Sequence, residues 1–303
     1  MNTRFLPQLV GTFEAACLRL FFAATVVWSI WTPSKYDRVE DPSGLASWGI
    51  PVAWIGQDGV HPWLLAGTMV AGLIYLLGVW KPGWLTFIGL AGMSVAHLGY
   101  WTLANSQGNT FHGSQMTSMV LVAQLAGWII MKWRSAAAIP ETPRWPGVDS
   151  ILLYFSQCAI VGVYVTCAIT KVLKSGGRWL IDSHYFAKSV QKVWRQQFYN
   201  NPSSNEFSGI SPWASWLAEH PMSARLLFAP GFFLEFFAFL MLWNRAWAAG
   251  FGASLVLMHV CIGFIMQLYF PEFEVIVLIF CVNLPYWLIR MKQRETPAMA
   301  KAV

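Results

Sequence analysis

Charged side chains are scarce in this chain. Of its 303 residues only 11% are Asp, Glu, Lys or Arg, whereas 56% are hydrophobic and 16% are aromatic. Soluble domains carry about 25% charged residues. The shortage of charge therefore excludes an ordinary soluble domain and indicates an integral membrane protein.

The sequence also lacks the motifs of several enzyme classes. It contains no HExxH, GxSxG, P-loop or GxGxxG pattern, so a hydrolase or a nucleotide enzyme has no support. Its five cysteines form no CxxC pair, and all of them fall inside apolar stretches. This pattern argues against a disulfide framework and against a cysteine metal site, and we interpret these cysteines as small packing residues.

Long apolar stretches are what the sequence has in place of charge. A helical crossing of the hydrocarbon core needs about 20 apolar residues, and the alternating segments of a barrel are absent. The sequence therefore predicts an all-α polytopic helical bundle with about eight transmembrane helices. They are expected at 8–31, 62–80, 83–104, 113–132, 149–173, 223–243, 246–269 and 273–290. Short connections favour a single integral membrane domain, 1–303, with loops 32–61 and 174–222 as possible caps.

Basic residues lie beside the predicted spans rather than in a separate patch, although the formal net charge is +6. Cytoplasmic loops carry an excess of Lys and Arg, which predicts that both termini are cytoplasmic and that no nucleic acid is bound. The short outer loops hold only Lys35 and Arg38. The segments predicted to be inside carry Arg4, Lys81, Lys132, Arg134, Arg144, Arg245, Arg290, Lys292, Arg294 and Lys301.

Two charged residues in the first span need partners from other helices. Charges within hydrocarbon are costly and usually face the bundle interior. Glu14 and Arg19 are five residues apart, which separates them by about 140° around a helix and prevents an i, i+4 pair. The favoured interpretation is structural bridges between helices.

Two further spans place a carboxylate and an imidazole at similar depth. Glu235 and His259 belong to spans joined by a short turn, so their helices should be antiparallel neighbours. Contact between them would give either a titratable site near neutral pH or a hydrogen bond that joins the helices, and the sequence leaves both readings open. His97, in the outer half of its span, is typical of a hydrogen-bonded core histidine.

A polar stripe marks the fifth span. Gln157, Tyr164 and Lys171 recur every seven residues, which places them on one side of a helix and favours an inward-facing wall. Lys171 comes near the outer end of the span. It is either a lysine that reaches the headgroups from a helix end or a site residue.

The order of the motifs resembles a known family. CLRLFF, ITKVLKSGGRWL, FFLEFFAFLML and LMHVCIGFIM follow one another along the chain, and this order is similar to that of the HTTM family. That family includes the membrane part of vitamin K-dependent gamma-glutamyl carboxylase and bacterial relatives such as the sporulation-delaying protein B family. DoxX-type quinone-linked proteins share part of the pattern and are a close alternative.

The resemblance implies a bacterial cytoplasmic membrane protein that binds a quinone or hydroquinone and performs redox-coupled modification of a partner. By this resemblance Lys171 would act as a base beside the reduced quinone, and Trp179 would match a tryptophan that follows the lysine in the family's sequence. The large lumenal domain of the carboxylase has no counterpart here, which makes glutamate carboxylation doubtful. With the polar residues inside the spans, the predicted catalytic residues are Lys171, His259 and Glu235, and the predicted cofactor-binding residues are His97, Tyr164 and Trp179; of these the resemblance itself implies Lys171 and Trp179. The alternative is a non-catalytic structural or maturation subunit that contacts lipids and other membrane subunits or a peptide.

Overall fold

Helices carry the chain through almost all the residues that the structure describes. The computed structural model describes residues 7–31, 52–55, 57, 59–81, 83–106, 112–136, 147–200 and 210–299, and within these ranges it contains helices and no strand. The protein is therefore an all-α polytopic helical bundle, as the sequence predicts.

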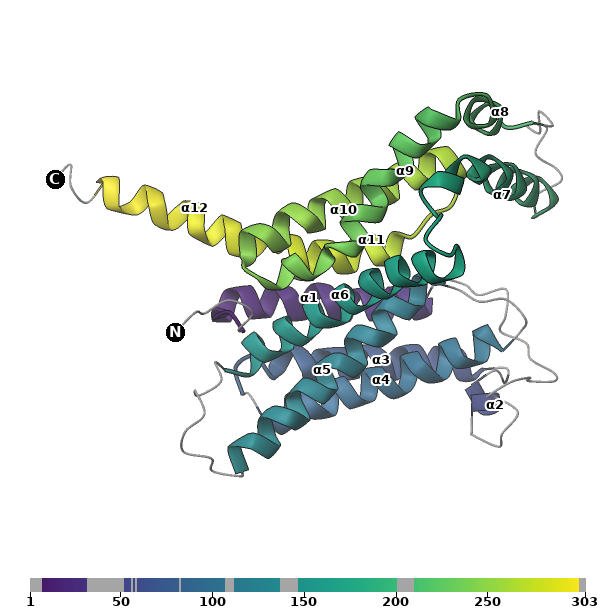
Figure 1. The fold of residues 1–303 in the computed structure, drawn as a ribbon. Helices are drawn as coiled ribbons and strands as arrows, with labels where there is room; N and C mark the ends of the chain where they lie inside the picture. Colours follow the sequence, from purple (N-terminus) through teal and green to yellow (C-terminus); the bar gives the residue numbers. More distant parts are fainter. Residues whose placement is uncertain are drawn as a thin grey trace.

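The first half of the chain forms five long helices. They are α1 (Thr12–Trp31), α3 (Val60–Leu77), α4 (Trp84–Asn105), α5 (His112–Ala136) and α6 (Val148–Lys174), and a short α2 (Val52–Ile55) packs against α3 and α4. In Figure 1 α3, α4 and α5 form one layer, and α1 and α6 lie between it and the later helices. Gly89 lets α4 approach α3, because a Cβ atom there would lie 2.5 Å from the backbone nitrogen of Tyr75.

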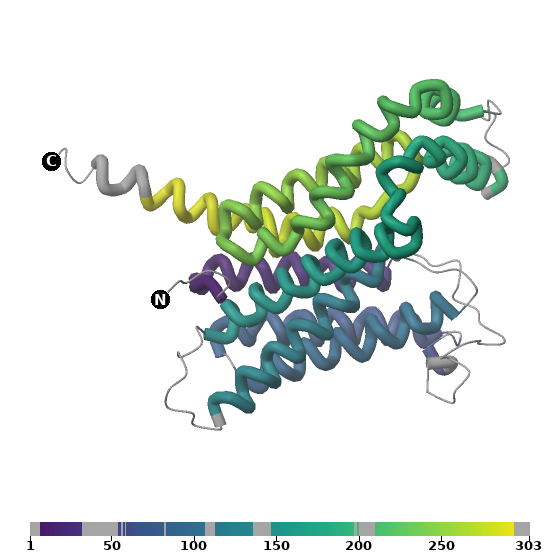
Figure 2. The backbone as a smooth tube through the Cα atoms, in the orientation of Figure 1, coloured from purple at the N-terminus to yellow at the C-terminus, as the bar shows by residue number. Residues whose placement is uncertain are grey.

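The second half forms the other layer and one end of the molecule. It contains η2 (Ile181–Tyr185), α7 (Phe186–Asn200), α8 (Pro212–Glu219), α9 (Pro221–Phe236), η3 (Ala238–Leu242), α10 (Arg245–Met266), α11 (Pro271–Val277), η4 (Leu278–Val282) and α12 (Leu284–Met299). Figure 2 shows α7 and α8 at the end of the bundle opposite the start of α1. The described parts of loop 174–222 thus lie at that end, where the possible cap is predicted, whereas most of loop 32–61 lies outside the described residues.

Seven helical segments of the described chain are long and apolar enough to cross a membrane: Thr12–Trp31, Val60–Leu77, Trp84–Asn105, Gly113–Ser135, Val148–Lys174, Arg245–Met266 and Pro271–Gln293. The remaining predicted span, 223–243, is divided into α9 and η3 at Phe237. The 16 residues of α9 reach only about 24 Å. The 3₁₀ turn of η3 adds about 10 Å, so the two together match a hydrocarbon core of about 30 Å.

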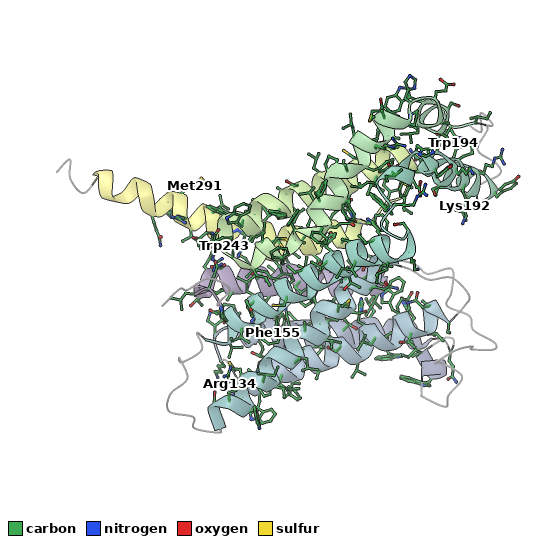
Figure 3. All side chains as sticks on the ribbon, viewed as in Figure 1. Arg134, Phe155, Lys192, Trp194, Trp243 and Met291 are labelled. Atoms are coloured by element: carbon green, nitrogen blue, oxygen red, sulfur yellow. The ribbon has the colours of Figure 1, made fainter. Side chains whose placement is uncertain are left out.

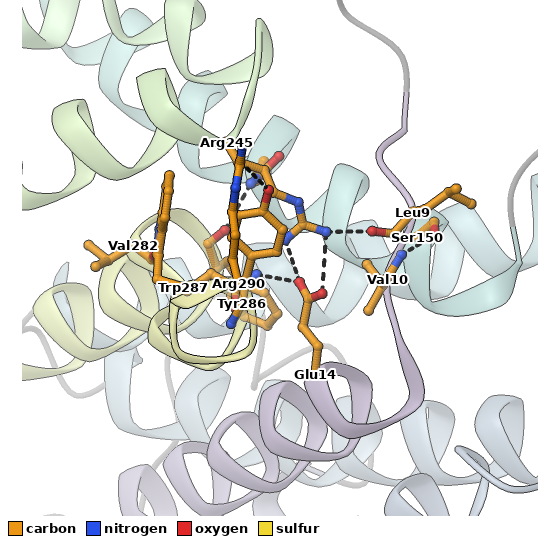
Figure 4. Close-up of polar contacts among 12 residues, drawn as sticks. Leu9, Val10, Glu14, Ser150, Arg245, Val282, Tyr286, Trp287 and Arg290 are labelled. Carbon is orange, nitrogen blue, oxygen red and sulfur yellow. Dashed lines mark hydrogen bonds and ion pairs between the residues drawn. The ribbon is translucent and has the colours of Figure 1, made fainter. Parts of the chain in front are cut away.

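The charged residues of α1 join separate parts of the bundle, as the sequence predicts. Arg19 binds Asp149 of α6 at 2.7 Å and donates to the carbonyl of Tyr75 on α3, also at 2.7 Å. Glu14 forms an ion pair with Arg245 at the start of α10 (Figure 4). Both α1 residues are buried, so these pairs fix α1 against both layers.

A π-helical turn just before the last helix also packs against α1. η4 is a π-helix, and the N–H of Asn283 donates to the carbonyl of Leu278 at 2.9 Å. Asn283 has a φ of 50° and donates through Nδ2 to Glu14 at 2.6 Å. Phe280, within the same turn, packs edge-on against Phe22 of α1 with ring centroids 5.1 Å apart.

Candidate functional site

The polar stripe of α6 faces the α9–α11 layer. Gln157 Nε2 donates to the carbonyl of Phe280 at 2.9 Å, and Tyr164 Oη lies 3.2 Å from His259 Nε2. Lys171 forms an ion pair with Glu235. The stripe therefore faces the interior of the bundle, as the spacing predicts, and each of its three residues has its own partner on the later helices.

Lys171 is held by a carboxylate rather than extended toward water. It lies in the last turn of α6, and its partner Glu235 lies at the end of α9. The lysine side chain is 29% exposed and the glutamate side chain 10%. The ammonium also lies 5.0 Å from the centroid of the Trp179 ring, which is within cation–π range.

A glycine turn brings Trp179 back over this ion pair. Gly176 and Gly177 have φ values of 58° and 79°, which glycine adopts without the strain of a side chain. The Trp179 ring then stacks on Phe232 of α9 with centroids 5.4 Å apart and an interplanar angle of 25°. The GGRW segment that follows α6 thus forms one wall of the site.

These groups line a cavity of about 430 Å³ between α9, α10 and the end of α6. Ligand pockets commonly measure about 300–1,000 Å³ and are mostly apolar with a few polar groups. Among the lining residues Leu257 is 63% exposed and Cys261 is also exposed, so the cavity reaches the outer surface of α10. The other lining residues are Phe186, Leu227, Phe228, Pro230, Gly231, Phe232, Leu234, Ser254, Met258, Ile262, Ile265 and Met266.

His259 lies near the ion pair, but among the described residues no hydrogen bond joins it to Glu235. The Glu235–His259 contact that the sequence suggests is replaced by two others, Glu235 with Lys171 and His259 with Tyr164. An ammonium group is a stronger partner for a carboxylate than a neutral imidazole, because the bond is charge-assisted at both ends. His259 Nδ1 is buried without a hydrogen-bond partner among the described residues.

Two predicted cofactor-binding residues do not line the cavity. Tyr164 lies seven residues before Lys171 on α6 and contacts His259, which does not line the cavity either. His97 is fully buried between α4 and α5, where its Nδ1 lies 3.1 Å from Ser118 Oγ. Of the six predicted site residues, Lys171, Glu235 and Trp179 line the cavity.

The apolar walls of the cavity are not predicted from the sequence. Phe228, Phe232 and Met258 carry no polar group, and in a membrane span such residues cannot be told from lipid-facing ones by composition. Pro230 is a lining residue whose type marks an irregular position in the sequence, because a proline inside a helix removes a backbone hydrogen bond.

Comparison with known proteins adds no further assignment. A scan against protein-family models, a search of curated proteins and a search of solved structures each returned no match. The resemblance to the HTTM family stays a prediction.

Proposed function

We propose that this integral membrane protein binds a quinone, or a similar isoprenoid lipid, in the cavity between α9 and α10. The bound lipid serves a redox-coupled modification of a partner, in a bacterial cytoplasmic membrane with both termini inside. One observation carries the proposal: an apolar cavity that reaches the outer surface of α10 has an ammonium, a carboxylate and an indole close together in its lining.

The residues fit the chemistry of a quinone headgroup. Lys171 Nζ can donate a hydrogen bond to a quinone carbonyl, and Glu235 can accept one from a hydroquinone hydroxyl. The Trp179 indole offers a flat face to an aromatic ring. The phenyl, leucine and methionine side chains along α9 and α10 suit an isoprenoid tail.

A quinone, when bound, supplies two-electron and two-proton redox chemistry. The Lys171–Glu235 ion pair holds a proton that can move between its two side chains. Transfer from Lys171 Nζ to Glu235 Oε2 leaves a neutral amine, the form that a base requires, and arginine could not make this transfer. A neutral pair also needs less solvation than an ion pair in an apolar cavity, which lowers the cost of that transfer.

A second candidate function rests on the similarity between two ion pairs that join helices of the bundle. Lys171–Glu235 joins α6 to α9 much as Arg245–Glu14 joins α10 to α1. A bridge of this kind needs no ligand, and it suits a non-catalytic structural or maturation subunit. A DoxX-like quinone-linked oxidoreductase subunit would share the lipid cavity.

The deciding experiment measures what copurifies. Protein extracted in mild detergent is analysed by liquid chromatography and mass spectrometry for quinone and for other protein subunits. The quinone hypothesis expects about one quinone per chain in wild type and a large loss in Leu257→Trp, which narrows the cavity. Val260→Trp is the matched control, because Val260 is exposed on α10 but does not line the cavity. Stable partner subunits without quinone would support the structural subunit instead.

A further inference from the structure

A second hollow lies between α7 and α8, outside the membrane-crossing helices. It measures about 650 Å³. Lys188, Lys192 and Arg195 all line it, and their spacing of four and three residues places them on one face of α7. Figure 3 shows Lys192 and Trp194 on α7 at the far end of the molecule.

The positive charge of this groove is not neutralised by the part of the chain that the structure describes. Among the described residues, none of the three cations takes part in an ion pair and no Asp or Glu lines the groove. The sequence has no acidic residue from Ser183 to Asn205. Three like charges on one helix face repel each other, so the groove is suited to an external anion.

The apolar face of α7 is already covered by the protein itself. Ala187 and Val190 pack with Leu217 of α8 and Ala224 of α9 in a small core. The helix therefore does not insert its apolar face into lipid, as a free amphipathic helix would. Lys188, Lys192 and Arg195 are exposed on a neighbouring face of α7, where they can reach a ligand.

The groove lies beside the start of α9, whose residues belong to the predicted span 223–243. α8 ends at Glu219, and α9 begins at Pro221. Trp213 and Trp216 on α8 are partly exposed at this level, and such residues concentrate at membrane–water interfaces. The groove also has an apolar floor, which includes Ala187, Ile210 and Ala214.

We propose that this groove binds the headgroup phosphate of an anionic phospholipid. Lys188, Lys192 and Arg195 hold the phosphate, and the apolar floor contacts the adjoining part of the acyl chains. A lipid is favoured over an acidic peptide because the cations and the apolar floor meet at headgroup level, beside the start of α9.

The test is a titration of the detergent-solubilised protein with short-chain phosphatidylglycerol, with phosphatidylcholine of equal chain length as reference. A basic residue near an anionic surface strengthens binding by about fivefold. The triple variant Lys188→Gln, Lys192→Gln, Arg195→Gln should therefore bind phosphatidylglycerol about 100-fold more weakly, since fivefold is lost three times.

Two further variants keep the result interpretable. The first changes three cations at the other end of the bundle, Lys81→Gln, Lys132→Gln and Arg290→Gln, and should bind like wild type. The second exchanges the cations, Lys188→Arg, Lys192→Arg and Arg195→Lys. It should also retain binding if charge is what matters, and a shared thermal unfolding profile shows that the variants fold.

Three results would overturn the proposal. The groove variant could bind phosphatidylglycerol as tightly as wild type. A polyglutamate peptide could bind the wild-type groove more tightly than the lipid, which would assign it to an acidic partner. Inorganic phosphate could compete as well as the lipid at equal concentration, which would show an anion site that does not recognise lipid.

Discussion

The Lys171–Glu235 pair should contribute a measurable coupling energy to the stability of the bundle. Lys171→Met keeps a long apolar stem and removes the ammonium, which leaves Glu235 as a carboxylate only 10% exposed. Removing one partner of a buried pair costs about 3–5 kcal/mol. Because Lys171 is 29% exposed and admits water to the pair, we expect the lower end, about 3 kcal/mol.

The opposite variant should cost less. In Glu235→Gln the lysine stem can carry its ammonium toward the headgroups, so we expect about 1 kcal/mol, in the range of one lost hydrogen bond. The double variant leaves no buried charge and should cost about 2 kcal/mol, less than the sum of the singles. The coupling in the double-mutant cycle is then about 2 kcal/mol.

The assay is unfolding in mixed micelles by increasing fractions of sodium dodecyl sulfate, followed by near-ultraviolet circular dichroism. The exposed pair Arg178–Asp182, with side chains 67% and 34% exposed, is the matched control and should couple by about 0.5 kcal/mol or less. A Lys171–Glu235 coupling no larger than that of the control would refute the reasoning, since it would mean that the pair is not desolvated.

Three other predictions follow from particular residues. Lys171→Arg should leave the protein folded but abolish function in a cell-based complementation assay, because arginine stays protonated. The control variant Lys174→Arg should be tolerated. A fully functional Lys171→Arg protein would favour the structural subunit. Gly89→Ala should lower the free energy of unfolding by about 2 kcal/mol through a backbone collision. Gly162→Ala, where nothing lies within 4 Å, should be neutral or stabilising by up to about 1 kcal/mol, and equal effects of the two glycine variants would contradict the α3–α4 contact. A reporter fused after Val303 should be cytoplasmic; an external one would rule out the eight-crossing path.

The bundle could be predicted because its signal is local. Each apolar stretch reports its own length, and seven of the eight predicted spans coincide with helical segments of the described chain that are long and apolar enough to cross a membrane. The break at Phe237 was not predicted, because it changes the hydrogen-bond pattern between α9 and η3 while the apolar composition continues.

The candidate site was only partly predictable because its contacts are distant in sequence. The spacing of Gln157, Tyr164 and Lys171 gave the face of α6 but not what that face meets. Glu235 was placed opposite His259 from the turn between their spans, but Lys171, 64 residues before the glutamate, takes the carboxylate. Competition between partners depends on three-dimensional distance, which periodicity does not contain.

The π-helical turn η4 sets which side of α12 faces the rest of the bundle. A π-turn accommodates roughly one residue more than an α-turn, and one residue corresponds to about 100° of rotation about the helix axis. Tyr286, whose ring lies 4.0 Å from the Arg245 guanidinium, is positioned by that rotation. Deleting one residue within 278–282 would therefore turn the start of α12 away from α10 while leaving its composition almost unchanged, so this part of the chain is more sensitive to length than to side-chain identity.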